Sequence, residues 1–308
     1  MKKRQQAQRS RTRSKIHLSS TGLILALGLS CHSCTHLPAT PVQEAATRLE
    51  DFARELGTAL RERADAPTSK SESLSKQGVQ TGGANSFAEC PQFFAEGRPP
   101  VVASGPTNRE LCFDAFAILH SGESKTPVFV AQKLNRASVK DAGEERTNRF
   151  YAEARLRSAE RATLEDYKTS GYDRGHMAPA GDMPTPRAMA QSFSLANMVP
   201  QASELNRGVW AKSVEMATRK SALRAAGDVY VITGPVYEPS ISQSPGIGPG
   251  QVRVPKYLFK LVYDESKHRV WAHWHLNDNL STGSRPVAYG ELVRRTGIEF
   301  LLGVNVAD

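Results

Sequence analysis

Short apolar runs separated by turn residues predict β-strands in the C-terminal two-thirds of the chain. The runs lie at 113–120, 127–131, 229–233, 257–263 and 270–274. They are rich in Val, Ile, Phe, Tyr and Trp, which fit a pleated surface. The residues Ser-Gly-Glu at 121–123 predict a hairpin turn between the first two runs, and Gly-Pro at 234–235 is expected to end the third.

Segments with helical periodicity are interspersed among these strands, at 186–194, 208–225 and 286–296. Strands grouped in hairpins with helices between them favour an α+β layered fold, because each sheet face needs a cover.

The beginning of the chain has the three-part order of a secretory signal peptide. A basic stretch in residues 1–33 ends at Lys15 and precedes the apolar run 22–29 and several small residues. This run is shorter than the roughly 20 residues that cross a hydrocarbon core. We therefore expect a signal peptide at 1–33, a periplasmic or secreted protein, and no transmembrane span in the mature chain. Cys31 follows Gly-Leu-Ser, which leaves lipid anchoring open.

Two further segments precede the main domain. Apolar residues recur at helical spacing within 34–65, which predicts an amphipathic helix that docks a partner or serves as a spacer. Residues 66–88 are rich in Ser, Lys, Gln, Gly and Thr, which is typical of a flexible linker. The folded domain is then expected at 89–308.

The net charge of +9 and the pI near 9.5 would favour nucleic-acid binding if the charge were spread over the folded domain. Most of the excess lies at the beginning of the chain instead. Residues 1–33 hold seven basic side chains and no acidic ones. Without these seven, 33 basic residues face 31 acidic ones, a net charge of +2. A phosphate-binding surface must therefore come from local clustering.

The four cysteines are compatible with export. Cys31 and Cys34 lie at the expected cleavage region. Cys90 and Cys112 remain in the mature chain, where an oxidising compartment permits a structural disulfide between them.

The candidate chemistry lies in three neighbouring segments. Asp-Arg-Gly-His stands at 173–176, Leu-Ala-Asn at 195–197, and Leu-Asn-Arg-Gly-Val-Trp at 205–210. Phosphodiester hydrolysis needs a base near neutral pH, and histidine has an ordinary pKa of about 6.5. Arginine grips phosphate through two donors, and an asparagine carbonyl is a hard ligand for Mg²⁺.

These segments resemble the DNA/RNA non-specific endonucleases of the ββα-metal superfamily, which include endonuclease G and secreted bacterial sugar-non-specific nucleases. Segments at 233–237, 254–257 and 295–297 occur in the same order as in that family. The resemblance implies a ββα-metal (His-Me finger) core, with a central, mainly antiparallel sheet flanked by helices.

The resemblance also implies roles for individual residues. His176 is similar to the general base, Arg174 and Asp173 to the pair that supports the site and the substrate, and Asn197 to an orienting asparagine. Arg149 is similar to an upstream arginine that contacts the scissile phosphate. Asn206 is similar to the one direct protein ligand of a largely hydrated Mg²⁺, for which Mn²⁺ is a substitute.

One departure from the family concerns a glutamate that serves the hydrated metal, four residues after Trp210. Val214 occupies that place here, and Glu215 follows. One step along an α-helix turns a side chain by about 100°. Either a local helix bulge restores Glu215 to the metal site, which we favour, or the surroundings of the metal are altered.

Other residues are assigned to packing. His273 and His275 have the spacing of two ligands on one strand face, but without a third ligand they are interpreted as strand packing. Trp210, Trp271 and Trp274 are interpreted as core residues.

The leading hypothesis is an exported, Mg²⁺-dependent endonuclease that cuts DNA and RNA without sequence preference and leaves 5′-phosphate ends. The alternatives are a catalytically weak or inactive nucleic-acid-binding or scaffold protein with the same fold, and a secreted effector nuclease neutralised by an inhibitor protein. The resemblance also leaves a homodimer open.

Overall fold

The computed structural model describes residues 87–307. The predicted signal peptide at 1–33, the predicted helix at 34–65 and nearly all of the predicted linker at 66–88 lie outside these residues. Within 87–307, no helix combines the length and the apolar content needed to cross a membrane.

The described part contains both strands and helices. The strands are β1 (Asn108–Cys112), β2 (Ala117–Ser121), β3 (Thr126–Leu134), β4 (Asp173–His176), β5 (Met198–Gln201), β6 (Val229–Val236), β7 (Gly246–Ile247), β8 (Val252–Arg253), β9 (Tyr257–Asp264) and β10 (Arg269–Leu276). The α-helices are α2 (Arg136–Asp141), α3 (Leu164–Tyr167), α4 (Pro186–Ser192), α5 (Ser203–Leu205), α6 (Met216–Arg224) and α7 (Tyr289–Thr296). A π-helix, η6 (Asn206–Glu215), joins α5 to α6, and the short 3₁₀ turns are η1 (Pro91–Phe93), η2 (Ala95–Gly97), η3 (Ser158–Glu160), η4 (Ala180–Asp182), η5 (Leu195–Asn197) and η7 (Glu265–Lys267).

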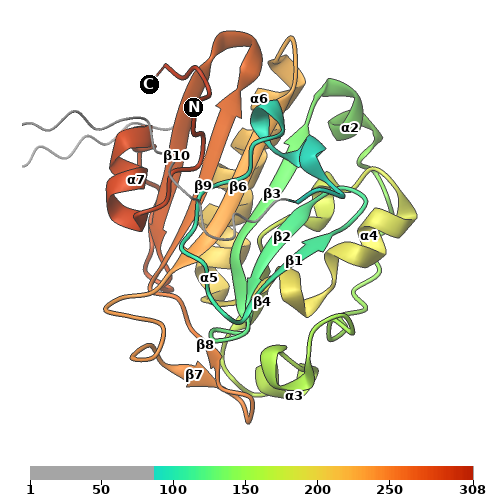
Figure 1. Cartoon of the computed structure of the whole chain (residues 1–308). Coiled ribbons are helices and arrows are strands. Elements are labelled where there is room, and N and C mark those ends of the chain that lie inside the picture. Colours follow the sequence, from blue (N-terminus) through green and yellow to red (C-terminus); the bar gives the residue numbers. More distant parts are fainter. Residues whose placement is uncertain (1–86, 308) are drawn as a thin grey trace, which may run out of the picture. The chain divides into compact units, whose positions relative to one another are not determined.

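A six-stranded sheet in the order β1-β2-β3-β6-β9-β10 forms the centre of the fold (Figure 1). All its neighbouring strands are antiparallel. Two small antiparallel pairs, β4-β5 and β7-β8, stand apart from it. The predicted α+β class and the mainly antiparallel sheet are confirmed.

The two faces of this sheet are covered by different parts of the chain. We call one the motif face, because it packs against the β4-β5 pair, α4 and η6 through Ile118, Val130 and Leu258. The other is the termini face, because residues from both ends of the described chain cover it. Its cluster includes Phe87, Phe94, Phe129, Phe259 and Phe300.

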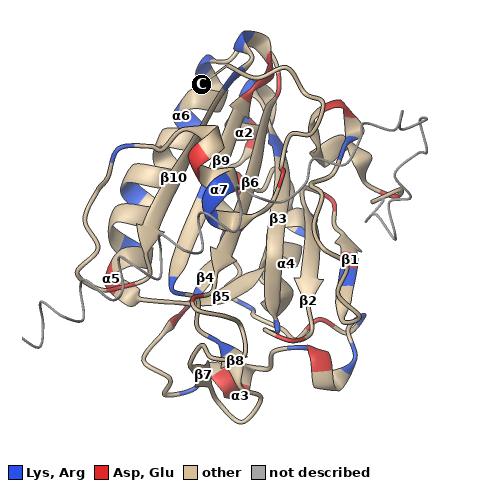
Figure 2. Cartoon of the chain, turned by 60° about the vertical axis from the view of Figure 1, so that its left-hand side comes forward, with Lys and Arg blue, Asp and Glu red and all other residues tan. Residues whose placement is uncertain are grey.

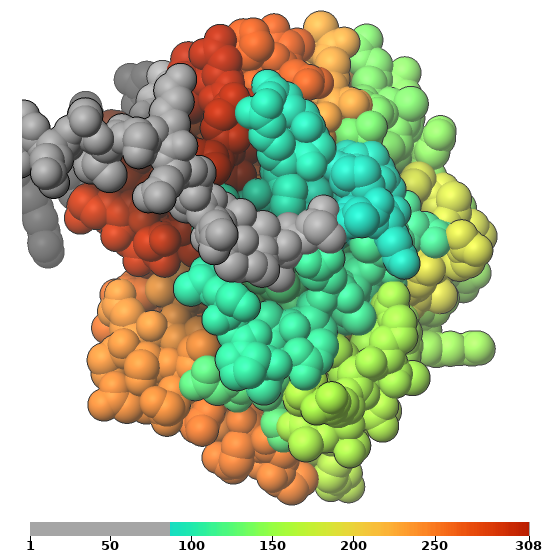
Figure 3. All heavy atoms as spheres, in the orientation of Figure 1, coloured from blue at the N-terminus to red at the C-terminus, as the bar shows by residue number. Residues whose placement is uncertain are grey.

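The termini face is tied together by the disulfide and by pairing of distant segments. Cys90 and Cys112 are bonded, as the sequence predicts. Val101 pairs with Glu299, so the first described residues lie beside the C-terminal segment; Figure 3 shows the two as adjoining blue-green and red surfaces.

The structure corrects the predicted strand at 113–120, because β2 begins only at Ala117. The Phe113 N–H donates to the Phe116 carbonyl at 3.0 Å, and this tight turn joins β1 to β2. The Asp114 carboxylate in the turn is bound by Arg187 and Gln191 near α4.

The predicted strand end at Gly234-Pro235 is also wrong, because β6 continues to Val236. Pro235 pairs with Leu258 of β9, while the register with β3 ends at Thr233. At Pro235 the strand is paired with β9 only, so the missing N–H of proline is tolerated there. A Cβ at Gly234 would lie 2.7 Å from the Val128 carbonyl oxygen, so the close approach of β3 requires glycine.

Candidate active site

The short β4-β5 pair presents the Asp-Arg-Gly-His motif. Arg174 is opposite Pro200 and His176 is opposite Met198. Gly175 lies between them, and a Cβ there would be 2.1 Å from the Gln201 amide oxygen. The pair can close only with glycine at this position, which explains the third residue of the motif.

His176 is buried to 8% exposure and lines a cleft of about 360 Å³. Its Nε2 has no hydrogen-bond partner within residues 87–307. The ring lies edge-on to Phe193, with centroids 5.0 Å apart. Burial, and then the nearby charges of Arg146 and Arg174, lower the pKa of His176 to about 3. The imidazole is therefore neutral at physiological pH, with an unused nitrogen.

The cleft brings together cationic and oxygen-bearing side chains from four parts of the chain. Besides His176, the polar side chains that line it are Arg146, Arg174, Asn206, Arg207, Glu215 and Arg219. Four arginines beside one neutral base form a site for an anionic group such as phosphate.

Asp173 anchors the metal-ligand candidate at the entrance to η6. Its carboxylate accepts hydrogen bonds from Asn206 Nδ2 at 2.9 Å, from Ser203 Oγ at 3.1 Å and from Arg207 at 2.6 and 2.8 Å. Burial alone would raise the pKa of Asp173, but these bonds outweigh it and lower the pKa. The Asn206 amide nitrogen is thus occupied, which leaves its carbonyl oxygen for a ligand in the cleft.

The π-helix η6 brings Asn206 and Glu215 to the same cleft. In an α-helix, nine steps of about 100° would place these residues on opposite faces. A π-helix closes its hydrogen bonds one residue later, so two wider turns return position 215 to the face of position 206. Val214 is buried in the core instead. The bulge that the displaced glutamate suggested is present.

Glu215 has a buried cation behind it. Burial raises the pKa of Glu215 to about 7, while the charges of Lys260 and Arg219 oppose that rise. Lys260 comes from β9 on the motif face and is 1% exposed. Its Nζ donates to Thr233 Oγ1 at 2.6 Å and to the Met177 carbonyl at 3.3 Å, next to His176.

Arg219 and Asp182 complete this charged group. Arg219 donates to Asp182 at 2.9 Å, and the Asp182 side chain is 4% exposed. A charge buried this deeply is tolerated only when it is paired.

Asn197 supports the site from behind and does not line the cleft. It is fully buried, its Oδ1 accepts from the Ala178 N–H at 2.9 Å, and its Nδ2 donates to the Ala178 and Ser192 carbonyls. These bonds fix the backbone that follows His176 against the end of α4.

The structure does not bring Arg149 to the cleft. Arg149 is exposed and is not among the lining residues, whereas Arg146 is. Asn148, between them, has a left-handed φ of 52°. The Arg146 guanidinium lies 5.0 Å from the centroid of the Phe193 ring.

Sequence reasoning missed Arg146, Lys260, Asp182 and Arg219. Arg146 lies in an irregular segment that has no periodicity to reveal it. Lys260 did leave a signal, because a lysine in the middle of the apolar strand Tyr257–Asp264 needs a buried partner.

The donor set of the cleft fits a hard, hydrated cation. Residues 87–307 contain no group of three or more His, Cys, Asp or Glu side chains placed to hold a metal ion. What the cleft offers is the Asn206 carbonyl and the Glu215 carboxylate. Few oxygen ligands suit Mg²⁺, which keeps several of its waters.

Comparison with known proteins identifies the family of the chain. Residues 98–307 match the family described as DNA/RNA non-specific endonuclease. Mitochondrial nuclease EXOG of Xenopus laevis is 35% identical over 160 residues, 49% of this chain and 44% of that protein. Nuclease C1 of Cunninghamella echinulata var. echinulata is 33% identical over 159 residues, 48% of this chain and 62% of that protein. The chain thus spans about half the length of the curated relatives it matches.

A solved structure shares the fold. It is described as the crystal structure of the EndoG/EndoGI complex and aligns with a TM-score of 0.59 at 22% identity, covering 72% of this chain and 93% of that chain. The expected ββα-metal architecture is thereby confirmed. By its match over residues 98–307, the chain belongs to the DNA/RNA non-specific endonuclease family.

Proposed function

We propose that this protein is an exported, Mg²⁺-dependent endonuclease that hydrolyses the phosphodiester bonds of DNA and RNA without sequence preference. The observation that carries the proposal is the unpartnered Nε2 of His176 in a cleft lined by arginines. Family membership supports the reaction class.

His176 is the general base in this proposal. Its neutral imidazole has a free nitrogen to take a proton from an attacking water. A pKa near 3 would make it a weak base, but the low value comes in part from Arg146 and Arg174. A bound phosphate offsets these charges, so substrate binding strengthens the base where it is needed.

Arg146 and Arg174 hold the phosphate. Arg174 is already oriented by the Phe150 ring, 4.2 Å from its guanidinium carbon, and Arg146 by Phe193. In this proposal Arg146, and not Arg149, contacts the scissile phosphate. Fixed guanidinium groups stabilise the negative charge that grows on the phosphate oxygens in the transition state.

Asn206 would hold the metal through its carbonyl oxygen, and Glu215 would serve the water bound to it. When bound, Mg²⁺ neutralises charge on the phosphate and helps the departing oxygen. Asp173 orients the Asn206 amide, and Lys260 and Arg219 favour the ionised form of Glu215. Asn197 is a positioning residue, because its bonds reach only backbone groups.

Broad substrate choice follows from what the cleft offers. Its charged groups suit the phosphate backbone, which carries no sequence information. Cleavage should therefore slow as salt rises.

Export is supported by the signal-peptide pattern at 1–33 and by the Cys90–Cys112 disulfide, which persists in oxidising compartments. We infer a periplasmic or secreted location. Fractionation of the producing cells tests this, and uncleaved protein confined to the cytoplasm would contradict it.

The decisive experiment is cleavage of supercoiled plasmid and of a structured RNA by the purified protein, with Mg²⁺ or with EDTA. Cutting of both substrates in Mg²⁺ only, with 5′-phosphate products, is expected. His176→Ala should lower the rate by about 10²–10⁴-fold. No cutting by folded wild-type protein at any Mg²⁺ concentration would overturn the enzyme proposal and favour a binding protein.

A further inference from the structure

A second basic pocket lies at the β10 edge of the sheet. Its volume is about 570 Å³, and its walls include Ser221 of α6, Arg269, Trp271 and His273 of β10, and Arg285. A bridge between Ala272 and Val287 brings the segment after β10 back beside this edge strand. We call this cavity the flanking pocket.

Helix α6 separates the flanking pocket from the cleft. Glu215 and Arg219, four residues apart, line the cleft, whereas Ala217 and Ser221 line the flanking pocket. The two pairs are offset by two residues, or about 200°, so they lie on nearly opposite sides of the helix. Lys212 of η6 and Lys220 of α6 are exposed, and Figure 2 shows basic residues along this helical segment beside β10.

The two arginines of the flanking pocket have no carboxylate partner in the described part of the chain. Arg269 and Arg285 are exposed, and neither forms an ion pair with a carboxylate of residues 87–307. His273 is 8% exposed, yet its Nε2 has no hydrogen-bond partner in the described chain. Burial lowers the pKa of His273 to about 4, so the ring is neutral at physiological pH. Because His273 lines the cavity, its buried nitrogen without a partner indicates a ligand that supplies one.

Trp271 supplies an aromatic wall. Trp210 is fully buried, as the sequence predicts for a core residue. Trp271 packs against the core cluster that includes Val262 but is only partly buried, and its ring lies 5.6 Å from the Arg269 guanidinium carbon. An aromatic ring with flanking guanidinium groups is the arrangement that binds single-stranded nucleic acid, by stacking on a base and gripping phosphates.

We propose that the flanking pocket is a second nucleic-acid site, which binds an unpaired base and the neighbouring phosphates of the strand that is cut. Trp271 stacks on the base, His273 bonds its edge or the sugar, and Arg269 and Arg285 hold the phosphates. This inference rests on the proposed nuclease function, since the strand reaches the pocket from the cleft.

The thickness of α6 sets the spacing between the two sites. A helix with its side chains is about 10–12 Å across. At about 3.4 Å per nucleotide along one strand, this distance corresponds to about three or four nucleotides. A trinucleotide held in the cleft is therefore too short to fill the flanking pocket, whereas a 20-mer can fill both.

The test is binding of a fluorescein-labelled 20-mer of single-stranded DNA to the full chain in EDTA, followed by anisotropy. Loss of a base–aromatic stack costs about fivefold or more in Kd. Trp271→Ala and Arg285→Glu should each weaken binding of the 20-mer by at least this factor, and by more than they weaken binding of a trinucleotide. Trp271→Phe, which keeps an aromatic ring, should restore most of the affinity.

Arg157→Glu is the control matched in charge to Arg285→Glu, because Arg157 is exposed and lies near Glu160, whose partner Arg109 is in β1 at the opposite edge of the sheet. It should leave the Kd unchanged. Wild-type affinity for the 20-mer in both Trp271→Ala and Arg285→Glu would overturn the proposal. It would also be overturned if the variants lost affinity for a 20-base-pair duplex but not for the single strand. Because binding is measured without turnover, failure here is distinct from failure of cleavage in Mg²⁺.

Discussion

The two faces of the central sheet carry different kinds of residue, and β9 shows the difference within one strand. Phe259, Leu261 and Tyr263 point to the termini face and join its apolar cluster. On the motif side Leu258 packs in the core, and Lys260 places a cation beneath Met177. A single strand thus supplies an apolar surface to one layer and a charge to the other.

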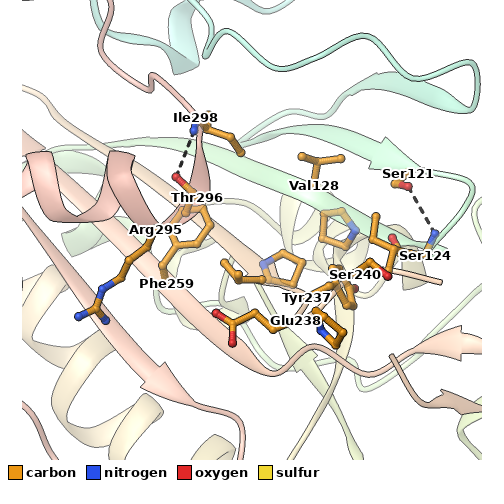
Figure 4. Close-up of a pocket in the computed structure, with 15 residues that line it drawn as sticks. Ser121, Ser124, Val128, Tyr237, Glu238, Ser240, Phe259, Arg295, Thr296 and Ile298 are labelled. Carbon is orange, nitrogen blue, oxygen red and sulfur yellow. Dashed lines mark hydrogen bonds between the residues drawn. The ribbon is translucent and has the colours of Figure 1, made fainter. Parts of the chain in front are cut away.

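The cavities of the two faces differ in the same way. The cavity beside the termini face, about 480 Å³, is lined by Val128, Phe259 and Ile298 among others (Figure 4). Its two charged side chains are already paired, Glu238 with Lys256 and Arg295 with Glu291. The cleft of the motif face instead holds the unpaired nitrogen of His176. Size alone does not mark the active site; what distinguishes the cleft is an unpartnered histidine nitrogen together with four arginines.

The residues that stabilise the fold and those that carry the chemistry therefore lie on opposite faces of one sheet. Substitutions on the termini face should then cost folding free energy and spare the rate of the folded enzyme. On the motif face, substitutions of the cleft residues and of the charged groups that contact them should cost rate. Four changes test this separation.

The largest effect is expected from Phe259→Ala on the termini face. Phe259 is fully buried and packs 5.2 Å from the Phe300 ring, so truncation leaves a cavity and should cost about 3–5 kcal/mol of unfolding free energy. Urea denaturation measures the loss. The cleavage rate per folded molecule should stay within about twofold of wild type; a tenfold drop would show that the two faces are coupled.

Removal of the disulfide is the second test on this face. Cys90 and Cys112 are 22 residues apart, and a loop of this length is worth about 3 kcal/mol when closed. The double change Cys90→Ala with Cys112→Ala should lower stability by that amount and preserve activity. Reduction of the wild-type protein should reproduce the loss, and equal stability with and without reductant would contradict it.

The sequence predicts the strands of the central sheet better than the points where they begin and end. The strands at 127–131, 257–263 and 270–274 were recognised because apolar β-formers cluster there, and the structure contains them. The errors lie at 113–116 and 234–235, where a turn bond and a one-sided ladder decide the backbone. Such long-range effects are invisible in local patterns.

The motif face was predictable only where the residues form a recognisable motif. The expected His176, Arg174, Asn206 and Glu215 all line one cleft. Arg146 could not be foreseen, because it enters the site through an irregular segment turned by Asn148. For Glu215 the sequence left two alternatives, a helix bulge or altered surroundings of the metal, and the π-helix η6 agrees with the favoured one.

The third test is Lys260→Met, which changes the motif face at the residue that follows Phe259 in β9. The substitution keeps the length of the side chain and removes the cation behind Glu215 and the donor to the Met177 carbonyl. We expect the cleavage rate to fall about 10–100-fold, which corresponds to about 1.4–2.7 kcal/mol in the transition state. The matched control is Val262→Met on the same side of β9, which should keep the rate. Full activity in Lys260→Met would show that the buried cation is only structural.

The smallest effect concerns His120, a buried histidine away from the cleft. Burial lowers its pKa to about 4, although the hydrogen bond from Nε2 to the Glu160 carbonyl, at 2.8 Å, and the charge of Glu160 partly oppose this. In the unfolded chain the pKa is about 6.5, so between these values the unfolded state binds more protons. The contribution of neutral His120 to stability is therefore complete above about pH 6.5 and is lost as pH falls toward 4.

His120→Gln can keep the bond to Glu160 and cannot titrate, so its unfolding free energy should depend less steeply on pH over this range. Urea unfolding at pH 4.5, 5.5 and 7 measures the slope. Because His120 lies outside the cleft, the cleavage rate of the folded variant at pH 7 should match wild type, and a slope identical to wild type would show that other buried histidines carry the whole dependence.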